Sequence, residues 1–491
     1  MNKFLVILFF FLLAGCSSAE TFKKPNFIFI MVDDLGKEWI ETYGATEIKT
    51  PNINQLAETG VIFNNAYSMP QCTPSRVALI TGQYPYSSGW INHYDVPRWG
   101  HGVNFDADKN PSFAKALQSE GYATCIAGKW QINDFRIEPK AMEKAGFQEY
   151  CMWTGYESGN KPSENRYWDP YIFTKNGSKT YKGEFGPDIF SDFIIEFMTK
   201  NKEKPMCIYY PMVLTHSPFV HTPQEPEVKT KYQKHQAMVR YTDFIIGKIV
   251  KSMKELDILD NTYLIFTTDN GTSNGIIGKR DSVYVRGGKS FLTENGINAP
   301  FLVVTPDKKQ FVSDALIDFT DIYPTLLDLA GVEDNSKSTG YSFAEVLQGK
   351  SQQSKRDWIL SMGGLTAKIS DNDRMENWFT FRDRVLRDEK YKVYTDTLKN
   401  IVRVFDLEVD PYETKNLIGA SEVKKTIEKF ENILSSLPDQ DAQPKYKKTV
   451  DSLYNVPDEK LNCCGGPKGA RKTNMLPLAT EEAFLKLSIK N

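Results

Sequence analysis

Hydrophobic positions along the chain follow two different patterns. Residues 26–32 and 262–268 are largely apolar runs, which is typical of strands buried on both faces of a sheet. The runs at residues 122–127 and 207–213 have the same character. Residues 232–256 instead place apolar side chains near helical spacing, which predicts an amphipathic helix. The sequence therefore predicts an α/β fold with a mixed, mostly parallel central sheet flanked by helices.

The pattern changes near the end of the chain. Residues 391–395 and 401–405 indicate a hairpin, residues 410–414 a turn, and residues 423–434 a closing helix. We therefore expect a large α/β domain over residues 22–380, a small α+β subdomain over residues 381–437 with an antiparallel sheet and a helix, and a tail over residues 438–491.

One short stretch combines a helix signal with a reactive side chain. Pro74 suits the first turn of a helix, the residues from Val77 are apolar, and Gly82 suits its end. Cys72 is therefore expected just ahead of a short buried helix, where backbone N–H groups favour an anion. Arg76 follows about one turn later. On residue type alone, a buried and inert cysteine is the simpler interpretation.

Two of the predicted strands end in oxygen-bearing side chains. Asp33 and Asp34 follow residues 26–32, and Asp269 and Asn270 follow residues 262–268. Open α/β sheets place their sites at the carboxyl ends of strands. Carboxylate and amide oxygens are ligands for Ca²⁺ or Mg²⁺ and not for a soft metal. A solvated turn is the alternative for an Asp-Asp pair taken alone.

The string Cys72-Thr73-Pro74-Ser75-Arg76, followed by Thr81-Gly82, resembles the signature of the type I sulfatases. Segments similar to other motifs of that family occur in order at residues 50–57, 128–131, 214–218, 287–300 and 318–331. The resemblance covers roughly residues 25–418. It implies an alkaline-phosphatase-like fold, with residues 22–380 as the sulfatase catalytic domain.

The resemblance also implies a chemistry. In that family the cysteine is oxidised after translation to formylglycine (3-oxoalanine), an aldehyde whose hydrate attacks the sulfur of a sulfate ester. Cys72 would be this nucleophile, and a formylglycine-generating or sulfatase-maturating enzyme would be a partner. One Ca²⁺ would be bound by Asp33, Asp34, residue 72, Asp269 and Asn270. The catalytic residues implied are Cys72, Arg76 beside the hydrate, Lys129 and Lys289 as positive charges, and His216 as proton donor to the leaving group.

Three positions depart from the family pattern. Gln131 stands where a histidine is usual, and a glutamine can hydrogen-bond but cannot take a proton. His93 and His101 are candidates for the missing base. Phe219 stands where a second histidine is common, and Asn298 where an arginine is common.

Two loops, residues 90–104 and 153–171, combine aromatic and cationic side chains and are predicted to form the rim of the pocket. Cations there can bind neighbouring sulfate or carboxylate groups, and aromatics can cover a sugar ring. The candidates for substrate binding are Gln131, His93, Arg98, His101, Arg166 and Trp168, with Trp99 and Tyr167 as further aromatics. The alternative is that these loops only fold over the sheet.

Composition narrows the substrate class. The chain of 491 residues has a formal net charge of −2, which argues against general binding to nucleic acid or to a membrane surface. Positive charge for a polyanionic substrate must therefore be local. We expect hydrolysis of sulfate monoesters on a sulfated polysaccharide or oligosaccharide, either algal (ulvan or carrageenan) or a glycosaminoglycan.

Two other functions remain open. A phosphatase or phosphodiesterase of the same superfamily would share the acidic ligands, but it would carry Ser or Thr as nucleophile and commonly two zinc ions. The chain has only five histidines and shows no His/Cys zinc spacing. The second alternative is a non-catalytic glycan-binding lipoprotein.

The first residues indicate export. Lys3 precedes an apolar run over residues 4–13, and Leu13-Ala14-Gly15-Cys16 resembles a bacterial lipobox. We expect residues 1–15 to be a signal peptide and Cys16 to carry lipid that anchors the protein to an outer membrane. Ser17 and the lack of an acidic run after it favour the periplasmic face. A plain secretory signal is the alternative. Of the seven cysteines, Cys463 and Cys464 could form an exposed pair or a vicinal disulfide.

The lipid anchor can be tested directly. Because acyl chains on Cys16 hold a protein at a bilayer, the wild-type protein should fractionate with membranes and need detergent for release. The Cys16→Ala variant should be soluble without detergent. Identical release of both proteins would contradict an anchor.

Overall fold

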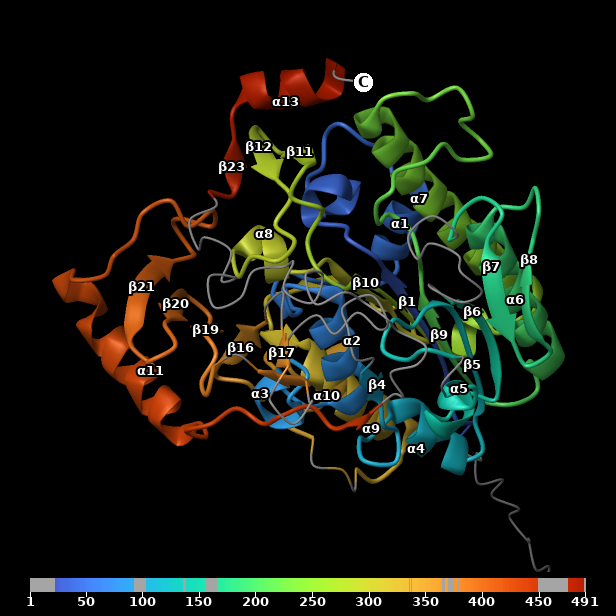
Figure 1. Cartoon of the computed structure of the whole chain (residues 1–491), viewed down its shortest axis with the longest axis horizontal. Helices are drawn as coiled ribbons and strands as arrows, with labels where there is room; N and C mark the ends of the chain where they lie inside the picture. Colours follow the sequence, from blue (N-terminus) through green and yellow to red (C-terminus); the bar gives the residue numbers. More distant parts are fainter. Residues whose placement is uncertain are drawn as a thin grey trace, which may run out of the picture.

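A ten-stranded mixed sheet, counted over the described residues, forms the centre of the computed structural model (Figure 1). The structure describes residues 23–91, 103–135, 138–154, 166–334, 336, 338–363, 367–369, 375–377, 379–448 and 476–489. The strand order is β14-β2-β13-β10-β1-β9-β5-β6-β7-β8. The bounds are β1 Asn26–Val32, β2 Val61–Phe63, β5 Ala123–Lys129, β6 Glu149–Trp153, β7 Tyr171–Thr174, β8 Gly177–Thr180, β9 Met206–Pro211, β10 Thr262–Thr268, β13 Phe301–Val304 and β14 Phe311–Ser313.

Five neighbouring strands at the centre, β10, β1, β9, β5 and β6, run parallel. The strands β1 and β10 have the bounds that the apolar runs predict. Successive side chains of β1 enter opposite cores, with Phe29 in one and Ile30 in the other, because side chains alternate along a strand. Both faces are therefore covered, and the predicted fold class is confirmed.

Helices cover the two faces. The face with Ile30 packs against α1 (Pro51–Ala57), α6 (Gly186–Asn201) and α7 (Lys231–Glu255), and the face with Phe29 packs against α2 (Cys72–Thr81), α4 (Phe113–Ser119) and α9 (Ile322–Ala330). The helix α7 confirms the predicted amphipathic segment. It begins at a capping box, in which Thr230 and Gln233 satisfy each other's backbone N–H groups.

Shorter elements connect these layers. The remaining strands are β3 Ala66–Tyr67, β4 Val103–Phe105, β11 Ile277–Arg280, β12 Val283–Arg286, β15 Ile317–Asp318, β17 Ala367–Ile369, β18 Met375–Asn377, β22 Tyr446–Lys448 and β23 Leu478–Ala479. The remaining short helices are α3 Pro85–Ser88, α5 Ala141–Lys144, α8 Glu294–Ile297, α10 Ala344–Leu347 and α13 Glu481–Ile489. The 3₁₀ helices are η1 Lys37–Trp39, η2 Glu41–Tyr43, η4 Leu259–Asn261, η5 Phe319–Asp321 and η6 Ser421–Val423.

The C-terminal region contains the expected antiparallel sheet and helix. The sheet has the order β16 (Ile359–Met362), β19 (Arg384–Arg387), β20 (Tyr391–Thr395) and β21 (Ile401–Asp406), and α11 (Lys424–Ser436) packs on it. Figure 1 places this region on the side opposite α6. The strand β16 precedes the boundary expected at residue 381, and the domain limits themselves stay a prediction.

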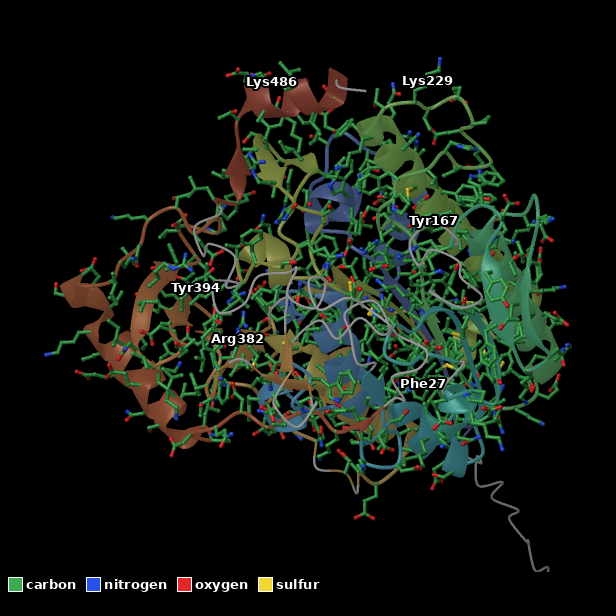
Figure 2. All side chains as sticks on the ribbon, in the orientation of Figure 1. Phe27, Tyr167, Lys229, Arg382, Tyr394 and Lys486 are labelled. Atoms are coloured by element: carbon green, nitrogen blue, oxygen red, sulfur yellow. The ribbon has the colours of Figure 1, made fainter. Side chains whose placement is uncertain are left out.

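A buried ion cluster joins this sheet to the main body. Lys392 Nζ on β20 lies 3.0 Å from Glu294 Oε1 at the start of α8 and 3.0 Å from Glu413 Oε1. Tyr394 (Figure 2), on the same strand, donates a hydrogen bond to Glu413. These contacts fix α8, and with it the loop that precedes α8, against the C-terminal sheet.

The described residues contain no helix that is both long enough and apolar enough to cross a bilayer.

Folding buries one histidine of α7 in the core, which predicts an acid-sensitive term in stability. Among the described residues neither ring nitrogen of His235 has a hydrogen-bond partner, and burial, aided by Lys231, lowers its pKa to about 3. Its unfolded pKa is about 6.5, so stability is lost as the pH falls from about 6.5 towards 3. Between pH 7.5 and pH 5, His235→Gln should lose about 2 kcal/mol less free energy of unfolding than the wild type.

Urea denaturation at the two pH values measures this difference. The half-buried His221 supplies the matched control, because His221→Gln makes the same substitution outside the core that encloses His235. Equal pH dependence in His235→Gln and the wild type would contradict the assignment.

Candidate active site

The register of β1 and β10 brings the predicted acids together. Val32 pairs with Thr268, so Asp33 and Asp269 leave neighbouring strands at the same edge of the sheet. Asp34 then turns back with φ 65°, and its backbone N–H donates to Asp269 Oδ1 at 3.1 Å. All three carboxylates are buried. The extension of β9 closes this edge, because Asp33 N donates to Leu214 O at 2.6 Å.

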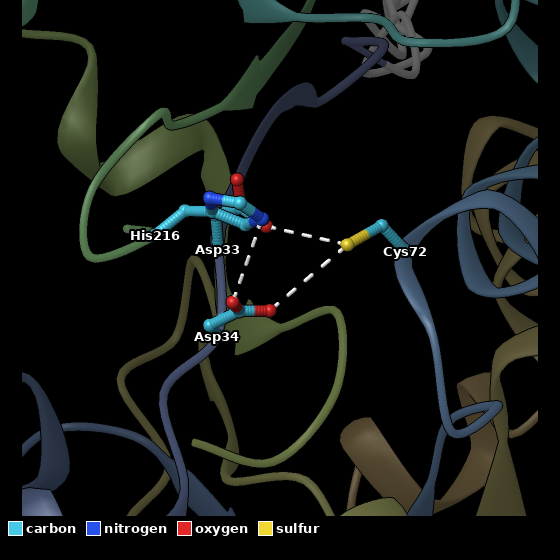
Figure 3. Close-up of side chains that lie close together, drawn as sticks. All are labelled: Asp33, Asp34, Cys72 and His216. Atoms are coloured by element: carbon cyan, nitrogen blue, oxygen red, sulfur yellow. Dashed lines mark hydrogen bonds and ion pairs between the residues drawn. The ribbon is translucent and has the colours of Figure 1, made fainter. Parts of the chain in front are cut away.

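Cys72 lies at the centre of this cluster. It is the first residue of α2, not the residue ahead of it, and Gly82 ends that helix in the left-handed conformation with φ 65°. Cys72 Sγ lies 3.5 Å from Asp33 Oδ1 and 3.5 Å from Lys129 Nζ. Figure 3 shows the thiol facing Asp33 and Asp34. Burial, followed by the charge of Asp269, raises the pKa of the Cys72 thiol, so the unmodified side chain stays protonated.

Three cations neutralise the carboxylates. Lys129 Nζ at the end of β5 lies 2.7 Å from Asp33 Oδ2. Arg76 Nη2, one turn into α2, donates to Asp269 Oδ2 at 2.8 Å, and its Nη1 donates to the carbonyl of Lys129 at 2.7 Å. Lys289 Nζ lies 2.6 Å from Asp34 Oδ2.

These cations decide how the buried carboxyls titrate. Burial alone would raise the pKa of Asp33, but the charges of Lys129, Arg76 and Lys289 outweigh it and hold that pKa well below its usual range. Burial and the neighbouring charge of Asp33 raise the pKa of Asp269. The pKa values of these two neighbouring carboxyl groups therefore shift in opposite directions, and the ionised form is favoured at Asp33.

Two glycines allow the cation-bearing segments to approach the site. A Cβ atom on Gly128, whose φ is +112°, would lie 2.1 Å from the carbonyl oxygen of Pro211 on the neighbouring strand. A Cβ atom on Gly288 would lie 2.4 Å from the carbonyl carbon of Asn295. Because Lys129 and Lys289 directly follow these glycines, both lysine positions depend on close backbone packing.

His216 lies at the open side of the cluster. Its Nε2 is 3.7 Å from Asp34 Oδ2, and its Nδ1 is 2.5 Å from the carbonyl oxygen of Ser217. That contact assigns the proton of the neutral ring to Nδ1. Burial and the charge of Lys289 lower the pKa of His216, so Nε2 presents a lone pair and must gain a proton before it can donate one.

The residues present fit a hard divalent cation. Ligand atoms of Asp33, Asp34, Cys72 and His216 lie within 4.8 Å of one another. Asn270 Oδ1 is buried and accepts no hydrogen bond from the described residues, while its amide nitrogen donates to Asp34 Oδ1 at 2.8 Å. An orphaned amide oxygen beside three carboxylates is a donor set suited to Ca²⁺ or Mg²⁺.

The candidates for substrate binding fall in three different places. Gln131 is half-buried directly after Trp130, with φ 69°. Arg166 lies inside the site and not at its rim: it is 2% exposed, its Nη1 is 3.5 Å from Asp33 Oδ2, and its guanidinium stacks on Trp153 at 4.0 Å. The predicted rim residues His93, Arg98, Trp99 and His101 lie outside the described residues.

Two aromatics predicted to cover a sugar ring have other contacts. Tyr167 is buried, and its hydroxyl donates to the carbonyls of Val213, at 2.8 Å, and His216. It therefore holds the His216 segment in place, which corrects the expectation of a sugar contact. Trp168 donates through Nε1 to the carbonyl of His221 at 3.1 Å and stacks on that ring.

Sequence reasoning missed the hydroxyls that fix the acidic turn after β1. Thr272 Oγ1 accepts a hydrogen bond from Gly36 N at 2.8 Å, and Thr215 Oγ1 donates to the carbonyl of Asp34 at 3.2 Å. The available signal was position, since both threonines follow core strands within a few residues. The departures Phe219 and Asn298 are also accommodated: Phe219 packs on His235, and Asn298 Oδ1 accepts a hydrogen bond from Lys37 at 2.6 Å.

Buried positive charge around one nucleophile position suits an anionic ester, so the fold and the site together define a hydrolase of such esters. The family model described as Sulfatase matches residues 25–332, and a second, N-sulphoglucosamine sulphohydrolase, C-terminal, matches residues 287–440. The chain therefore belongs to the sulfatase family and is a sulfuric ester hydrolase.

Several relatives with known names match most of this chain. The chain is 26% identical to an ulvan-active sulfatase of Formosa agariphila, with 81% of this chain and 78% of that protein covered. It is 24% identical to N-acetylglucosamine-6-O-sulfatase of Bacteroides thetaiotaomicron, with 91% and 90% covered. The crystal structure of Ps i-CgsB in complex with k-i-k-neocarrahexaose has a TM-score of 0.70 and 25% identity, and covers 87% of this chain and 96% of its own.

The position of Arg166 predicts an effect on every substrate. Arg166→Met removes a buried cation beside Asp33, so kcat/KM on a small aryl sulfate should fall about 10-fold to 100-fold. Trp168→Phe removes a ring nitrogen that donates to the carbonyl of His221, away from the carboxylate cluster, and it should change that value less than about threefold. Steady-state kinetics on the aryl sulfate decide the matter. Unchanged aryl-sulfate kinetics in Arg166→Met would contradict a role for this residue inside the catalytic site.

Proposed function

We propose that this sulfatase acts on a sulfated polysaccharide or oligosaccharide, with Cys72 converted to formylglycine as its nucleophile. The observation that carries the proposal is the place of Cys72, whose Sγ is 3.5 Å from both a carboxylate and an ammonium at the first turn of α2. Burial raises the pKa of its thiol, which makes the unmodified side chain a poor nucleophile. A formylglycine hydrate would supply a hydroxyl there to attack sulfur.

One Ca²⁺ would be held by Asp33, Asp34, Asp269, Asn270 and residue 72. The buried orphan oxygen of Asn270 supports this set. When bound, such an ion polarises an oxygen of the sulfate and lowers the pKa of a hydroxyl beside it. The ion would also relieve the repulsion among the three carboxylates, which the neighbouring lysines offset when no ion is bound.

The chain's own residues then have separable roles. Arg76 is held at both ends of its guanidinium, by Asp269 and by the Lys129 carbonyl, so it positions residue 72. Lys129 and Lys289 are fixed positive charges for the non-bridging oxygens of a sulfate. His216 is the most accessible titratable group of the cluster after Lys289, with 16% of its side chain exposed. It would hold the proton for the departing alcohol once Nε2 is protonated.

The relatives support a glycan substrate. Two of them are named for glycan-linked sulfates, and one structural neighbour is a neocarrahexaose complex. A phosphatase is disfavoured because a cysteine occupies the nucleophile position and the described residues show no second cluster of metal ligands. A non-catalytic glycan-binding protein would have no need of the cations Lys129, Arg76 and Lys289 around Cys72. Rates on a panel of sulfated oligosaccharides would identify the sugar and the ester position.

The formylglycine mechanism requires a maturation partner. A cysteine at residue 72 needs a formylglycine-generating or sulfatase-maturating enzyme, which would act before folding buries the side chain, since Cys72 is 1% exposed. The outer-membrane anchor through Cys16 belongs to the same proposal.

Conversion of Cys72 is directly measurable. The mass of the tryptic peptide containing residue 72 should fall by the difference between CH₂SH and CHO in the active protein, and intact-mass spectrometry reports the converted fraction. Cys72→Ala should lower kcat by roughly 10⁴-fold or more. The buried, inert Cys125 gives the control, because Cys125→Ala should retain turnover. Full activity from unconverted Cys72 would refute the mechanism.

Metal content gives a separate test. The wild type should contain one Ca²⁺ per chain by elemental analysis, and Asp34→Asn should lose most of it together with activity, because the site loses a charged ligand. Asp260, with 71% of its side chain exposed, is the control position: Asp260→Asn should keep both. Two zinc ions per chain would favour the phosphatase alternative.

A further inference from the structure

Lys37 is a buried ammonium whose two acceptors are neutral. Its Nζ donates to the carbonyl of Asn64 at 2.9 Å and to Asn298 Oδ1 at 2.6 Å, and the residue is 7% exposed. No carboxylate among the described residues lies within the 4.0 Å ion-pair distance of Lys37 Nζ. Buried charges in proteins are normally paired, so this lysine lacks a counter-ion.

Two arginines share the cavity that Lys37 borders. The cavity has a volume of about 180 Å³, and Arg280 and Arg387 line it together with Tyr412. Burial, and then these two arginines, lower the pKa of Lys37. The three side chains come from η1, β11 and β19, so elements far apart in the sequence place positive charge around one small space.

The acids that line the cavity do not balance this charge. Glu294 contacts the buried Lys392 at 3.0 Å and Arg387 at 3.6 Å, and it accepts a hydrogen bond from Tyr67 at 2.7 Å. Burial raises the pKa of Glu38 to about 7, so its carboxyl is only partly ionised at neutral pH. Because Lys392 also pairs with Glu413, Glu294 can be counted against Arg387. Lys37 and Arg280 then face only the partly ionised Glu38 and the exposed Asp281, which lies 4.0 Å from Arg280 Nε. The three cations that line the cavity therefore outnumber its two acids.

The cavity is large enough for an oxyanion and has an approach. A single water needs roughly 10–15 Å³ of such space, so a tetrahedral anion fits with water around it. A second, wider cavity of about 820 Å³ shares Asn65, Arg387 and Leu407 with the first. The smaller space therefore adjoins a larger hollow between β14 and the C-terminal sheet.

We propose that Lys37, Arg280 and Arg387 form a second oxyanion site, separate from the catalytic centre, for sulfate or for a sulfate group of the substrate. Arginine suits this chemistry because its planar guanidinium binds an oxyanion through two parallel N–H groups. The site is independent of the formylglycine mechanism, since the cavity lining includes neither Cys72 nor the three carboxylates of the catalytic cluster. Lys37 lies three residues after Asp34, and Glu294 lies five residues after Lys289. An oxyanion bound in the cavity would therefore stabilise the segments that carry these two active-site residues.

Selenate replaces sulfate closely and scatters anomalously, so it is the probe. Crystals of the full mature chain, grown without sulfate, should show two anomalous peaks after soaking: one at the catalytic centre and one within hydrogen-bond distance of Lys37 Nζ. The catalytic peak is the internal control. A peak at the catalytic centre alone, at the same selenate concentration, would overturn the proposal.

Two neighbouring residues on β11 give a matched pair of variants. Arg280→Met removes a cation from the cavity, and the selenate concentration for half occupancy there should rise about tenfold or more. Lys279→Met makes a similar change in charge at the adjacent position, whose side chain pairs with Glu47 instead, and should leave occupancy unchanged. Lys37→Met should abolish the cavity peak. If Lys37→Met does not fold, the Arg280 and Lys279 variants still decide, and equal occupancy in both would overturn the assignment.

Kinetics distinguish the two sources of the oxyanion. If the site holds part of the substrate chain, Arg280→Met should raise KM for a sulfated oligosaccharide and leave KM for an aryl sulfate unchanged. If it holds free sulfate, added sulfate should change kcat on the aryl sulfate in the wild type and not in Arg280→Met. Either result supports the site, and the absence of both effects would leave the cavity without a role and overturn the proposal.

Discussion

The structure depends on burying three carboxylates at one edge of the sheet. Each buried ion costs several kcal/mol in lost hydration, and this cost is recovered only when partners of opposite charge are in place. Asp33, Asp34 and Asp269 each contact a different cation. These cations come from α2, β5 and the loop after β12, so the acids at the end of β1 and β10 draw distant parts of the chain to one point.

The same constraint explains how rigid the surroundings are. The backbone that carries a cation must lie close to the buried carboxylate that the cation contacts. Gly128 and Gly288 allow this close packing, because a side chain at either position would clash with neighbouring backbone. The C-terminal sheet contributes from a distance. Through Lys392 and Glu413 it holds Glu294, which begins α8 five residues after Lys289. The small subdomain therefore helps to position a charge of the active site without contributing a side chain to it.

The departures from the family pattern differ in how far the structure explains them. Asn298 is shorter than the arginine common at that position, and Lys37 reaches it from another segment, so positive charge is retained there while space is left beside it. Phe219 joins an aromatic contact with His235. Among the described residues, His216 is the one histidine beside Cys72 that could replace the base lost at Gln131, and its neutral ring keeps the lone pair of Nε2, because Nδ1 donates to Ser217.

The sequence by itself determined the central apolar strands, the C-terminal hairpin, the helix near Cys72 and the identity of the polar groups at the strand ends. Each of these is a local property, because apolar runs, helix caps and motif spacing depend only on residues that are close together in the sequence. Only the tertiary structure decided that Arg166 enters the site, that Tyr167 orients His216, and that Lys37 shares a cavity with two arginines. Those placements depend on strand register and on charges brought together from distant segments, where burial makes each unpaired group expensive.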